Sequence, residues 1–376
     1  MEVLNIITNY TNFDDLKTQL KELHLHVRKY DELGLFLVKY NKNTSDMENS
    51  DVQKCRGLVG EVATGNLVCL PPIKSIECDK FMDIVGTELN DVSIEEFIDG
   101  TMINLFYFGN EWHISTRSNI GANCRWYSQK HFSELFEESN TLDFDMLEKQ
   151  MTYTFVLRHP ENRIVTSYTE PSITLVAARK IVDGQVIDHD IFEIGEALKI
   201  NVPTRYDMTT IDEIISFTER QDFQFQGIVL KNGLLRTKIR NPNYNYARNL
   251  RGNSQNLKFL YFDLRKNQFV QEYLRFFPEY TETFEEYNKE YTELLNMVFN
   301  NYQNFHVKKL VKSIKDMDYV TRPFCYELHG EYKKNKGGNN YFKITRQFVS
   351  NFMNELPPAR IVYALNHQSP ESPEST

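Results

Sequence analysis

An acid, a glycine and a hydroxyl stand side by side at Asp99-Gly100-Thr101. This run predicts a polar turn, and a turn of this composition is suited to holding a ligand. The two preceding residues do not fit that purpose, because Phe97 and Ile98 are large and apolar. A physical reason is therefore needed for an aromatic ring placed directly beside a polar turn.

A basic stretch in the middle of the chain is the second candidate for chemistry. Between Asp222 and Asp263 there is no acidic residue. A cationic patch on a chain of net charge −9 indicates a defined anion site rather than a general attraction to polyanions. The alternative is an ordinary solvated basic face. The basic residues of the stretch are Lys231, Arg236, Lys238, Arg240, Arg248, Arg251 and Lys258.

Length and composition limit the class of protein. The 376 residues, 41% of them apolar, are enough for two globular domains, and no apolar run is long enough to span a membrane. The N-terminus carries acids where a secretory signal peptide carries bases. Five cysteines without a C-x-x-C pair indicate free thiols in a reducing compartment. We therefore expect a cytoplasmic protein. We also expect no metal site, since His24 and His26 lack a third ligand.

The segment from residue 30 to 240 is mostly strand-like, with short apolar runs separated by Gly, Asn and Asp turns. A hairpin is predicted around Gly109-Asn110, where apolar residues alternate on both sides. Helical patterns occupy 129–150 and 209–220, and the second begins with Thr209 or Thr210 as its cap. The expected fold class is α+β with antiparallel sheets. The strand-like runs are LGLFLVKY, GLVGEV, NLVCL, TYTFVLR, ITLVAARKI and GIVLK.

The character of the sequence changes after Leu257. From Tyr280 to Phe305 aromatic and apolar residues recur every three or four positions, which predicts one buried face of a long helix. A second helix is predicted near 343–355, and the Pro- and Ser-rich tail is expected to be disordered. The predicted domains are 1–255, 256–366 (helical) and a tail, 367–376.

Five segments follow one another along the first domain, and together they resemble a known family. Their order and spacing are similar to those of the phage-type ATP-dependent RNA ligases, the RNA ligase 1 family of the covalent nucleotidyltransferase superfamily. The resemblance covers roughly residues 30–255 and implies a nucleotidyltransferase fold. The segments are Lys54-Cys55-Arg56-Gly57 with Asp79-Lys80-Phe81; Phe97-Ile98-Asp99-Gly100-Thr101; Ser115-Thr116-Arg117-Ser118; Phe155-Val156-Leu157 with Asn162-Arg163-Ile164-Val165; and Gln226-Gly227-Ile228-Val229 with Lys238-Ile239-Arg240.

The resemblance implies a chemistry whose reagents this chain lacks. In the family, a lysine two residues before the Asp-Gly attacks the α-phosphate of ATP, and carboxylates hold the metal and the ribose. Here Phe97 stands at the lysine position, and a phenyl ring has no lone pair to form the adduct. Val156 and Gln226 stand at two carboxylate positions. Burying such a ring stabilises the fold by roughly 1.5–3 kcal/mol, so the ring is expected to fill or cap the cleft.

Other family positions keep residues that can bind phosphate, and we expect no catalytic residue and no metal ligand among them. Arg163 could instead donate structural hydrogen bonds to a neighbouring hairpin. Tyr244 and Tyr246 could stack on bases or pack locally after Pro242. The phosphate-binding candidates, for a nucleotide or an RNA, are Arg56, Lys80, Asp99, Arg117, Arg163, Lys238 and Arg240.

Three functions remain open from the sequence. The favoured one is a catalytically inactive RNA-ligase-like protein that binds nucleotide or RNA phosphates, with a viral source and a role in RNA repair implied by the resemblance. The second is an active ligase that uses a displaced lysine together with ATP and Mg²⁺. The third is an interaction subunit with a filled cleft, whose protein partner binds the helical domain. The candidate displaced lysines are Lys54, Lys80, Lys180, Lys231 and Lys238.

Overall fold

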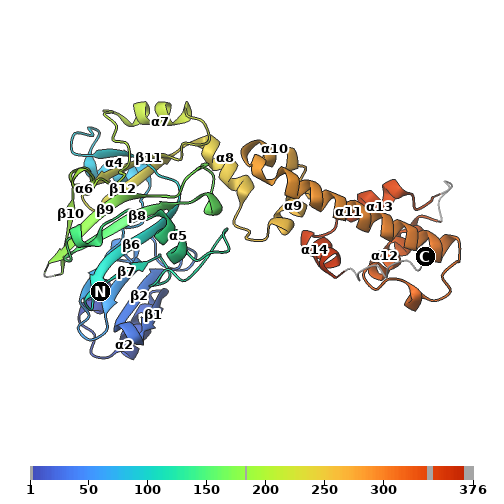
Figure 1. Cartoon of the computed structure of the whole chain (residues 1–376), viewed down its shortest axis with the longest axis horizontal. Coiled ribbons are helices and arrows are strands. Elements are labelled where there is room, and N and C mark those ends of the chain that lie inside the picture. The colour runs from blue at the N-terminus through green and yellow to red at the C-terminus, as the bar shows by residue number, and fades with distance from the viewer. Residues whose placement is uncertain (1–2, 183, 337–341, 368–376) are drawn as a thin grey trace. The chain divides into compact units, whose positions relative to one another are not determined.

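The computed structural model describes residues 3–182, 184–336 and 342–367. The chain divides into two compact units, Met1–Arg248 and Asn249–Thr376 (Figure 1). The domain limits expected from the sequence, 1–255 and 256–366, remain a prediction. The tail beyond residue 367 lies outside the described residues.

An antiparallel sheet of four strands begins the first unit. Alternate residues of its second strand are buried on both faces. Phe36 and Val38 pack with the helices α1 and α2, whereas Leu35 and Leu37 pack toward Phe106 of the next sheet. Burial on both faces explains why this strand reads as a continuous apolar run. The elements, in sheet order and then helices, are β1 (Leu25–Tyr30), β2 (Leu35–Tyr40), β3 (Arg56–Glu61), β4 (Leu67–Cys69), α1 (Val3–Thr8), α2 (Phe13–Glu22) and α3 (Ser50–Lys54).

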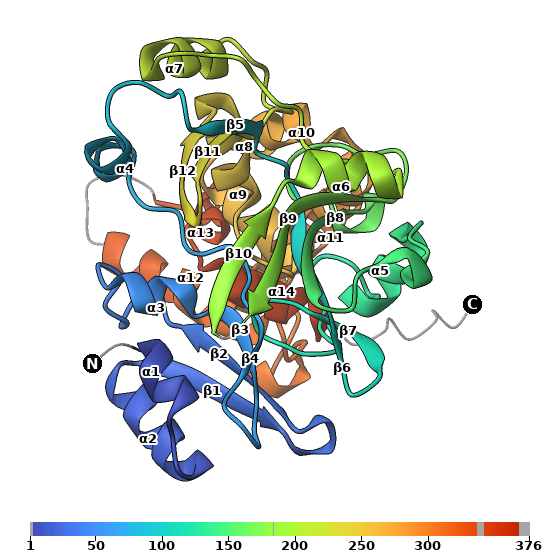
Figure 2. The ribbon, with the colours of Figure 1, turned by 90° about the vertical axis from the view of Figure 1, so that its left-hand side faces the viewer.

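The second sheet has five antiparallel strands, with α5 and α6 packed against it (Figure 2). The predicted hairpin is confirmed, because Tyr107 pairs with Trp112 across the β6–β7 turn. Gly109 and Asn110 both have positive φ, as a tight hairpin turn of this kind requires. The elements, in sheet order and then helices, are β10 (Gln185–His189), β9 (Ser172–Val182), β8 (Met151–Arg158), β6 (Thr101–Phe108), β7 (Glu111–Ser115), α5 (Phe132–Ser139) and α6 (Ile191–Leu198).

The third sheet contains three antiparallel strands and carries most of the basic stretch. Ile228 and Leu230 lie in a core with residues of α4 and α7, which flank the sheet in Figure 2. Since side chains alternate along a strand, Val229 and Lys231 point to the opposite face, toward the second sheet. The elements, in sheet order and then helices, are β12 (Leu235–Arg240), β11 (Gly227–Asn232), β5 (Ser93–Glu96), α4 (Cys78–Val85) and α7 (Ile211–Glu219).

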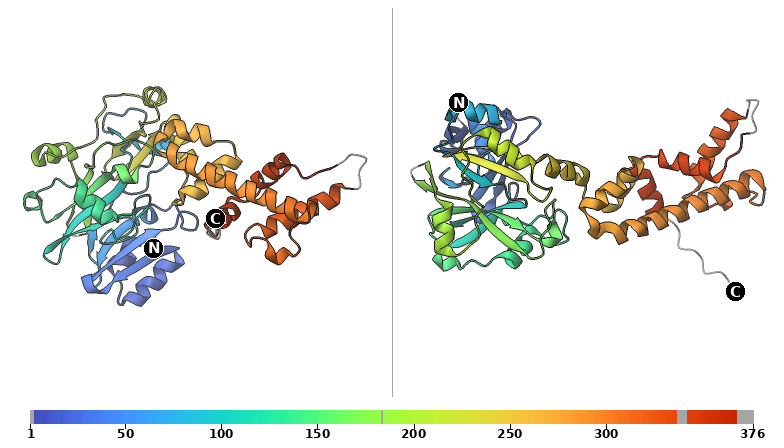
Figure 3. Two further views of the ribbon diagram at one scale, coloured as in Figure 1. Left: turned by 45° about the vertical axis from the view of Figure 1, so that its right-hand side comes forward. Right: turned by 90° about the horizontal axis from the view of Figure 1, so that it is seen from above.

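The second unit is helical, and α8 (Pro242–Arg251) leads into it. Figure 3 shows its helices in two further views. Its core is rich in aromatic rings, among them Tyr273, Phe284 and Tyr291. The predicted long helix is confirmed as α11, whose 22 residues bury one aromatic face. The helices are α9 (Leu257–Lys266), α10 (Val270–Phe276), α11 (Thr281–Tyr302), α12 (Arg322–Asn335), α13 (Arg346–Asn354) and α14 (Pro358–Asn366), with a π-helical turn at Gln303–Val307.

The expected α+β class with antiparallel sheets is confirmed, as are the strand-like runs and the helix at 209–220, which Thr210 caps. The helix predicted over 129–150 is wrong beyond Ser139. Asn140 is extended there, and the apolar residues that follow pack singly onto the second sheet. The helix α14 was not predicted, because Pro358 begins it rather than closing the preceding helix.

All five cysteines lie within the described residues, and all are free thiols, as expected. Among the described residues, no helix is both long and apolar enough to cross a membrane.

Gly227 at the start of β11 yields a test of the fold. Its φ is +140°, and a Cβ there would lie 2.1 Å from the carbonyl oxygen of Ile239. We expect Gly227→Ala to destabilise the first unit by at least ~2 kcal/mol, because backbone must move as well as adopt a strained φ. Urea unfolding measures this loss. Gly233→Ala is the matched control, since Gly233 also has positive φ (+53°) but open space around it. Equal losses in the two variants would contradict the crowding.

Candidate functional site

A cavity of about 260 Å³ lies in the first unit, between the second and third sheets. Most of the residues singled out from the sequence line it, although they come from five separate segments of the chain. Strands β8, β11 and β12 and the turn after β5 supply its walls. The predicted site residues that the fold brings together here are Arg56, Phe97, Asp99, Val156, Gln226, Lys238 and Arg240.

Asp99 is a structural anchor of this cavity. Its carboxylate is buried and accepts hydrogen bonds from the backbone N–H groups of Val165 (3.0 Å) and Thr166 (2.9 Å). The hydroxyl of Tyr244 donates a third bond, at 2.7 Å. A carboxylate with three donors holds its neighbours firmly in place. The polar turn seen in the sequence is therefore joined to the loop after β8 and to α8 by its acid.

Tyr244 is fully buried and bonded to Asp99, so its prediction as a base-stacking platform is wrong. The alternative, that Tyr244 packs locally after Pro242, is confirmed, although the residue lies on the helix α8 rather than in a turn. Burial and the nearby Asp99 carboxylate raise the pKa of Tyr244 above its usual range. Tyr246 remains partly exposed on the same helix.

Phe97 lies between the polar turn and the basic strand. Its backbone N–H donates to the carbonyl of Gly227, at 2.9 Å, which fixes the ring beside β11. Lys238 Nζ lies 5.5 Å from the ring centroid and Arg240 Cζ lies 5.6 Å from it. At these distances the negative face of an aromatic ring attracts a cation. The ring thus stabilises two positive charges, whereas a lysine at this position would add a third.

Val156 and Gln226, for which the resemblance implies carboxylate positions, contribute no negative charge to the cavity. Val156 lies within β8, where it pairs with Met102 and Thr174, and its side chain offers no ligand atom. Gln226 is buried, and its Oε1 accepts no hydrogen bond within the described structure. A buried acceptor without a donor is costly, so this oxygen is available to a ligand that can donate.

The β11–β12 pair concentrates positive charge on the cavity side. Arg236, Lys238 and Arg240 alternate along β12, so their side chains share one face. Arg56 joins them from β3, and its Nη1 donates to the carbonyl of Pro72 at 3.2 Å. Burial, then the neighbouring Arg56 and Arg179, lower the pKa of Arg236 to about 9. The Nε groups of Arg236 and Arg240 are buried without a hydrogen-bond partner among the described residues.

Lys238 is an amine of the cavity whose pKa is strongly lowered. Desolvation, followed by repulsion from Arg240, Arg236 and Arg56, lowers its pKa to about 7. Part of the side chain is exposed, so water screens some of this repulsion. Near neutral pH this ammonium therefore loses its proton more readily than an ordinary lysine does.

The cavity also contains a buried ion pair that the sequence did not indicate. Lys231 Nζ bonds to the carboxylate of Glu95 and donates to the carbonyl of Val176, at 2.9 Å. Burial lowers the pKa of Lys231 although Glu95 opposes the shift. Lys231 and Glu95 compensate each other's charge, so Glu95 does not neutralise the cations of β12.

Three predicted phosphate-binding residues do not line the cavity. Lys80 is exposed and pairs with Glu48. Arg117 donates through Nη2 to the carbonyl of Tyr40, at 2.8 Å, and lies over its ring. Arg163 donates through Nε to the carbonyl of Val165, at 2.8 Å.

Sequence reasoning missed Lys42 and Glu95 and did not assign Lys231, Arg236 or Arg248 to the cavity that they all line. For Arg236 a signal exists, because in LRTKIR the basic residues alternate with period two and must share a face. Lys42 stands in a polar loop, and nothing local marks it.

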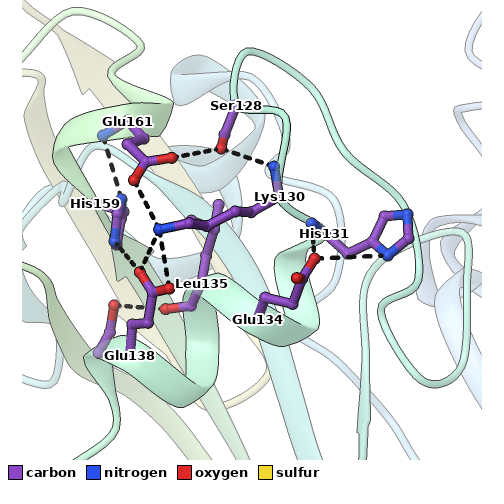
Figure 4. Close-up of polar contacts among 9 residues, drawn as sticks. Ser128, Lys130, His131, Glu134, Leu135, Glu138, His159 and Glu161 are labelled. Atoms are coloured by element: carbon purple, nitrogen blue, oxygen red, sulfur yellow. Dashed lines mark hydrogen bonds and ion pairs between the residues drawn. The ribbon is translucent and has the colours of Figure 1, made fainter.

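Figure 4 shows a second polar cluster. It lies near the Asp99-Gly100-Thr101 turn, because Asn162, next to Glu161, donates to the hydroxyl of Thr101. Glu138, His159 and Glu161 are close enough to hold a metal ion. Lys130 Nζ, however, lies between the two carboxylates, 2.9 Å from Glu138 and 2.8 Å from Glu161. Hydrogen bonds to Glu161 and then Glu138 raise the pKa of Lys130, and the ammonium lowers the pKa of both acids. The lysine thus already compensates one of the two negative charges of the group.

No protein-family model matches the chain. Among curated proteins, it is 24% identical over 251 residues to a putative bifunctional polynucleotide kinase/RNA ligase of Autographa californica nuclear polyhedrosis virus, covering 61% of this chain and 35% of that protein. It is 26% identical over 331 residues to an immediate-early protein ICP-46 homolog of Invertebrate iridescent virus 6, and the match covers 77% of this chain and 70% of that protein. The RNA ligase of Rhodothermus phage RM378 is 29% identical over 125 residues, and the match covers 29% of this chain and 27% of that protein.

The chain therefore spans about a third of the length of the first of these relatives. Among solved structures, a putative ATP-dependent DNA ligase from Aquifex aeolicus aligns with a TM-score of 0.45 and 14% identity, covering 95% of this chain and 99% of that one. An archaeal ATP-dependent RNA ligase aligns with a TM-score of 0.47 and 11% identity, covering 91% and 95%. In sequence, the chain is thus similar to proteins of viruses and of a phage, two of which are named as RNA ligases.

Proposed function

We propose that this chain binds the phosphates of a nucleotide or an RNA in the cavity of the first unit and does not transfer a nucleotidyl group. The observation that carries the proposal is the environment of Phe97. An aromatic ring occupies the position where the resemblance implies a reactive amine, while Lys238 and Arg240 remain beside it.

The side chains that line the cavity disfavour nucleotidyl transfer. A phenyl ring cannot form a phosphoramidate. Mg²⁺ prefers several oxygen ligands, usually including carboxylates. Val156 and Gln226 supply no carboxylate, Asp99 is bonded to three protein donors, and Glu95 is paired with Lys231. Glu96 is the remaining acid of the lining, and it accepts a hydrogen bond from the hydroxyl of Thr204 at 3.0 Å. The cavity therefore offers the metal of ATP-dependent ligation a single carboxylate that is neither ion-paired nor bonded to three donors.

The excess of positive charge in the cavity favours the binding of an anion. Buried guanidinium groups without counter-charges destabilise a fold, and an anion that enters the cavity relieves their mutual repulsion. Arg guanidinium groups also match the geometry of phosphate oxygens. Apolar residues such as Val229 and Met102 line the same cavity, so it offers an apolar surface beside the cationic one, as sites for organic phosphates do.

Incubation with α-labelled ATP and Mg²⁺, followed by a denaturing gel, tests the loss of transfer. We expect no labelled band from the wild-type chain. We also expect none from Phe97→Lys, because Val156 and Gln226 still cannot hold the metal. Retention of α-labelled ATP on a filter without the denaturing step should remain positive. A covalent band from either protein would contradict the proposal.

A second candidate function is favoured by one observation, the lowered pKa of Lys238. An amine that is partly neutral near pH 7 inside a phosphate-binding cavity meets a requirement for a nucleophile. On this alternative the chain would be an active nucleotidyltransferase with a displaced lysine. A labelled band that disappears in Lys238→Arg would support it and would replace the first proposal.

The same lysine predicts how anion binding depends on pH. With a pKa of about 7 in the free protein, Lys238 is mostly protonated at pH 6 and mostly neutral at pH 9. A bound phosphate favours the ammonium and raises its pKa, so binding above pH 7 must take up a proton. The affinity for ATP should therefore fall as the pH rises above 7. The full fall is roughly tenfold for each unit by which the pKa of Lys238 is higher in the bound state than in the free state.

Calorimetric titrations with ATP from pH 6 to pH 9 measure this fall. Lys238→Arg is the matched control, since a guanidinium holds its proton more strongly than an ammonium. Between pH 6 and pH 8 its profile should keep only the titration of the phosphate itself, and the titration of Arg236 should enter near pH 9 in both proteins. Superimposable profiles of the wild-type chain and this variant would show that Lys238 does not titrate at the site.

A further inference from the structure

The charges of the helical unit are strongly segregated along its sequence. The first half of α11 is acidic, ending at Glu293, and no acidic residue then occurs until Asp316. A second stretch without acids extends from residue 332 to 354. Lysines lie in both stretches, so positive charge gathers wherever the fold brings the two together. The exposed lysines in the described parts of these stretches are Lys308, Lys309, Lys312, Lys315, Lys333, Lys334, Lys336 and Lys343.

A pair of stacked histidines joins the two stretches. His306, in the π-helical turn that follows α11, stacks on His329 of α12 with ring centroids 3.9 Å apart and an angle of 11° between the rings. Tyr302 packs against His306, and Tyr332 stacks on His329 at 5.8 Å. The end of α11 and the last turns of α12 are thus held side by side by aromatic contacts.

The lysines of both stretches lie around this pair. Burial, then the neighbouring His329 and then the charges of Lys309 and Lys333 lower the pKa of His306, to about 4, so the ring is neutral at physiological pH. The pKa of His329 is lowered by burial and by the same two lysines together with Lys336. Within the described ranges, neither Lys309 nor Lys333 forms an ion pair, whereas Lys334 is paired with Glu331.

Two further features distinguish this surface from a solvated lysine patch. His306 Nε2 and His329 Nδ1 are buried and have no hydrogen-bond partner among the described residues. Large apolar and aromatic side chains also stand exposed close by in the sequence, with Leu310 70% exposed and Tyr326 56% exposed. A helical spacing of three and seven residues puts Tyr326 on the same face of α12 as His329 and Lys333.

We propose that this lysine-rich surface around the His306–His329 pair is a second polyanion site, one that binds the backbone of single-stranded RNA. Lysines without counter-charges attract phosphates, and exposed aromatic side chains accept unpaired bases by stacking. The proposal goes beyond phosphate binding in the first unit and does not depend on it, because the two sites share no residue.

Salt-dependent binding of a fluorescent single-stranded oligoribonucleotide to the full chain tests the proposal. The triple variant Lys309→Gln, Lys333→Gln and Lys336→Gln should bind at least about tenfold more weakly at 0.1 M salt. The slope of log affinity against log salt should become shallower by about 2, since each phosphate contact to a single strand contributes about 0.7. Binding of ATP by this variant should be unchanged.

The matched control is Lys17→Gln, Lys21→Gln and Lys289→Gln, which removes three exposed lysines elsewhere in the chain. An unchanged salt slope in the test variant would overturn the proposal, as would an equal loss in the control. Loss of binding to anionic lipid vesicles without loss of RNA binding would also overturn it and would identify a membrane surface. Failure of ATP binding in the wild-type chain, with the RNA result as expected, would overturn only the function proposed for the first unit.

Discussion

Repulsion between like charges in a confined space is the constraint on which the first unit depends. Three basic residues alternate along β12, and Arg56 reaches the same cavity from β3. Water solvates such groups poorly once they are enclosed, so each residue beside them either relieves or aggravates the strain. The ring of Phe97 relieves it through its negative face. The aromatic residue is therefore compatible with the cations that line the cavity.

The polar turn after β5 has a structural role that does not depend on catalysis. The carboxylate of Asp99 accepts three hydrogen bonds, and Gly100 adopts φ +146°, where a Cβ would lie 2.4 Å from the carbonyl oxygen of Leu157. Both residues are therefore required by the fold itself. Selection for a stable first unit would keep them even if nothing were ever bound. The retention of such a turn is consequently weak support for catalysis in any relative of this kind.

The sequence predicted the strands, the hairpin and the long helix well, because their apolar periodicities are regular. It also predicted which segments meet at the cavity, since their order resembles a known family. It failed for contacts that depend on distant residues. Nothing local marks Tyr244 as the donor to Asp99 or Lys231 as the partner of Glu95. Likewise, Arg117 and Arg163 stand at matching positions, yet they donate to backbone carbonyls.

The cluster around Lys130 has a consequence for how this corner of the first unit responds to its medium. An ion recruited from solution dissociates when its supply is low or when a chelator competes for it. An ammonium on a covalent tether has a fixed local concentration that no dilution can reduce. Next to Glu161, Asn162 donates to the hydroxyl of Thr101 at 3.2 Å, so the anchored loop supports the first residue of β6. The geometry beside the cavity is thereby independent of the divalent ions available to the cell.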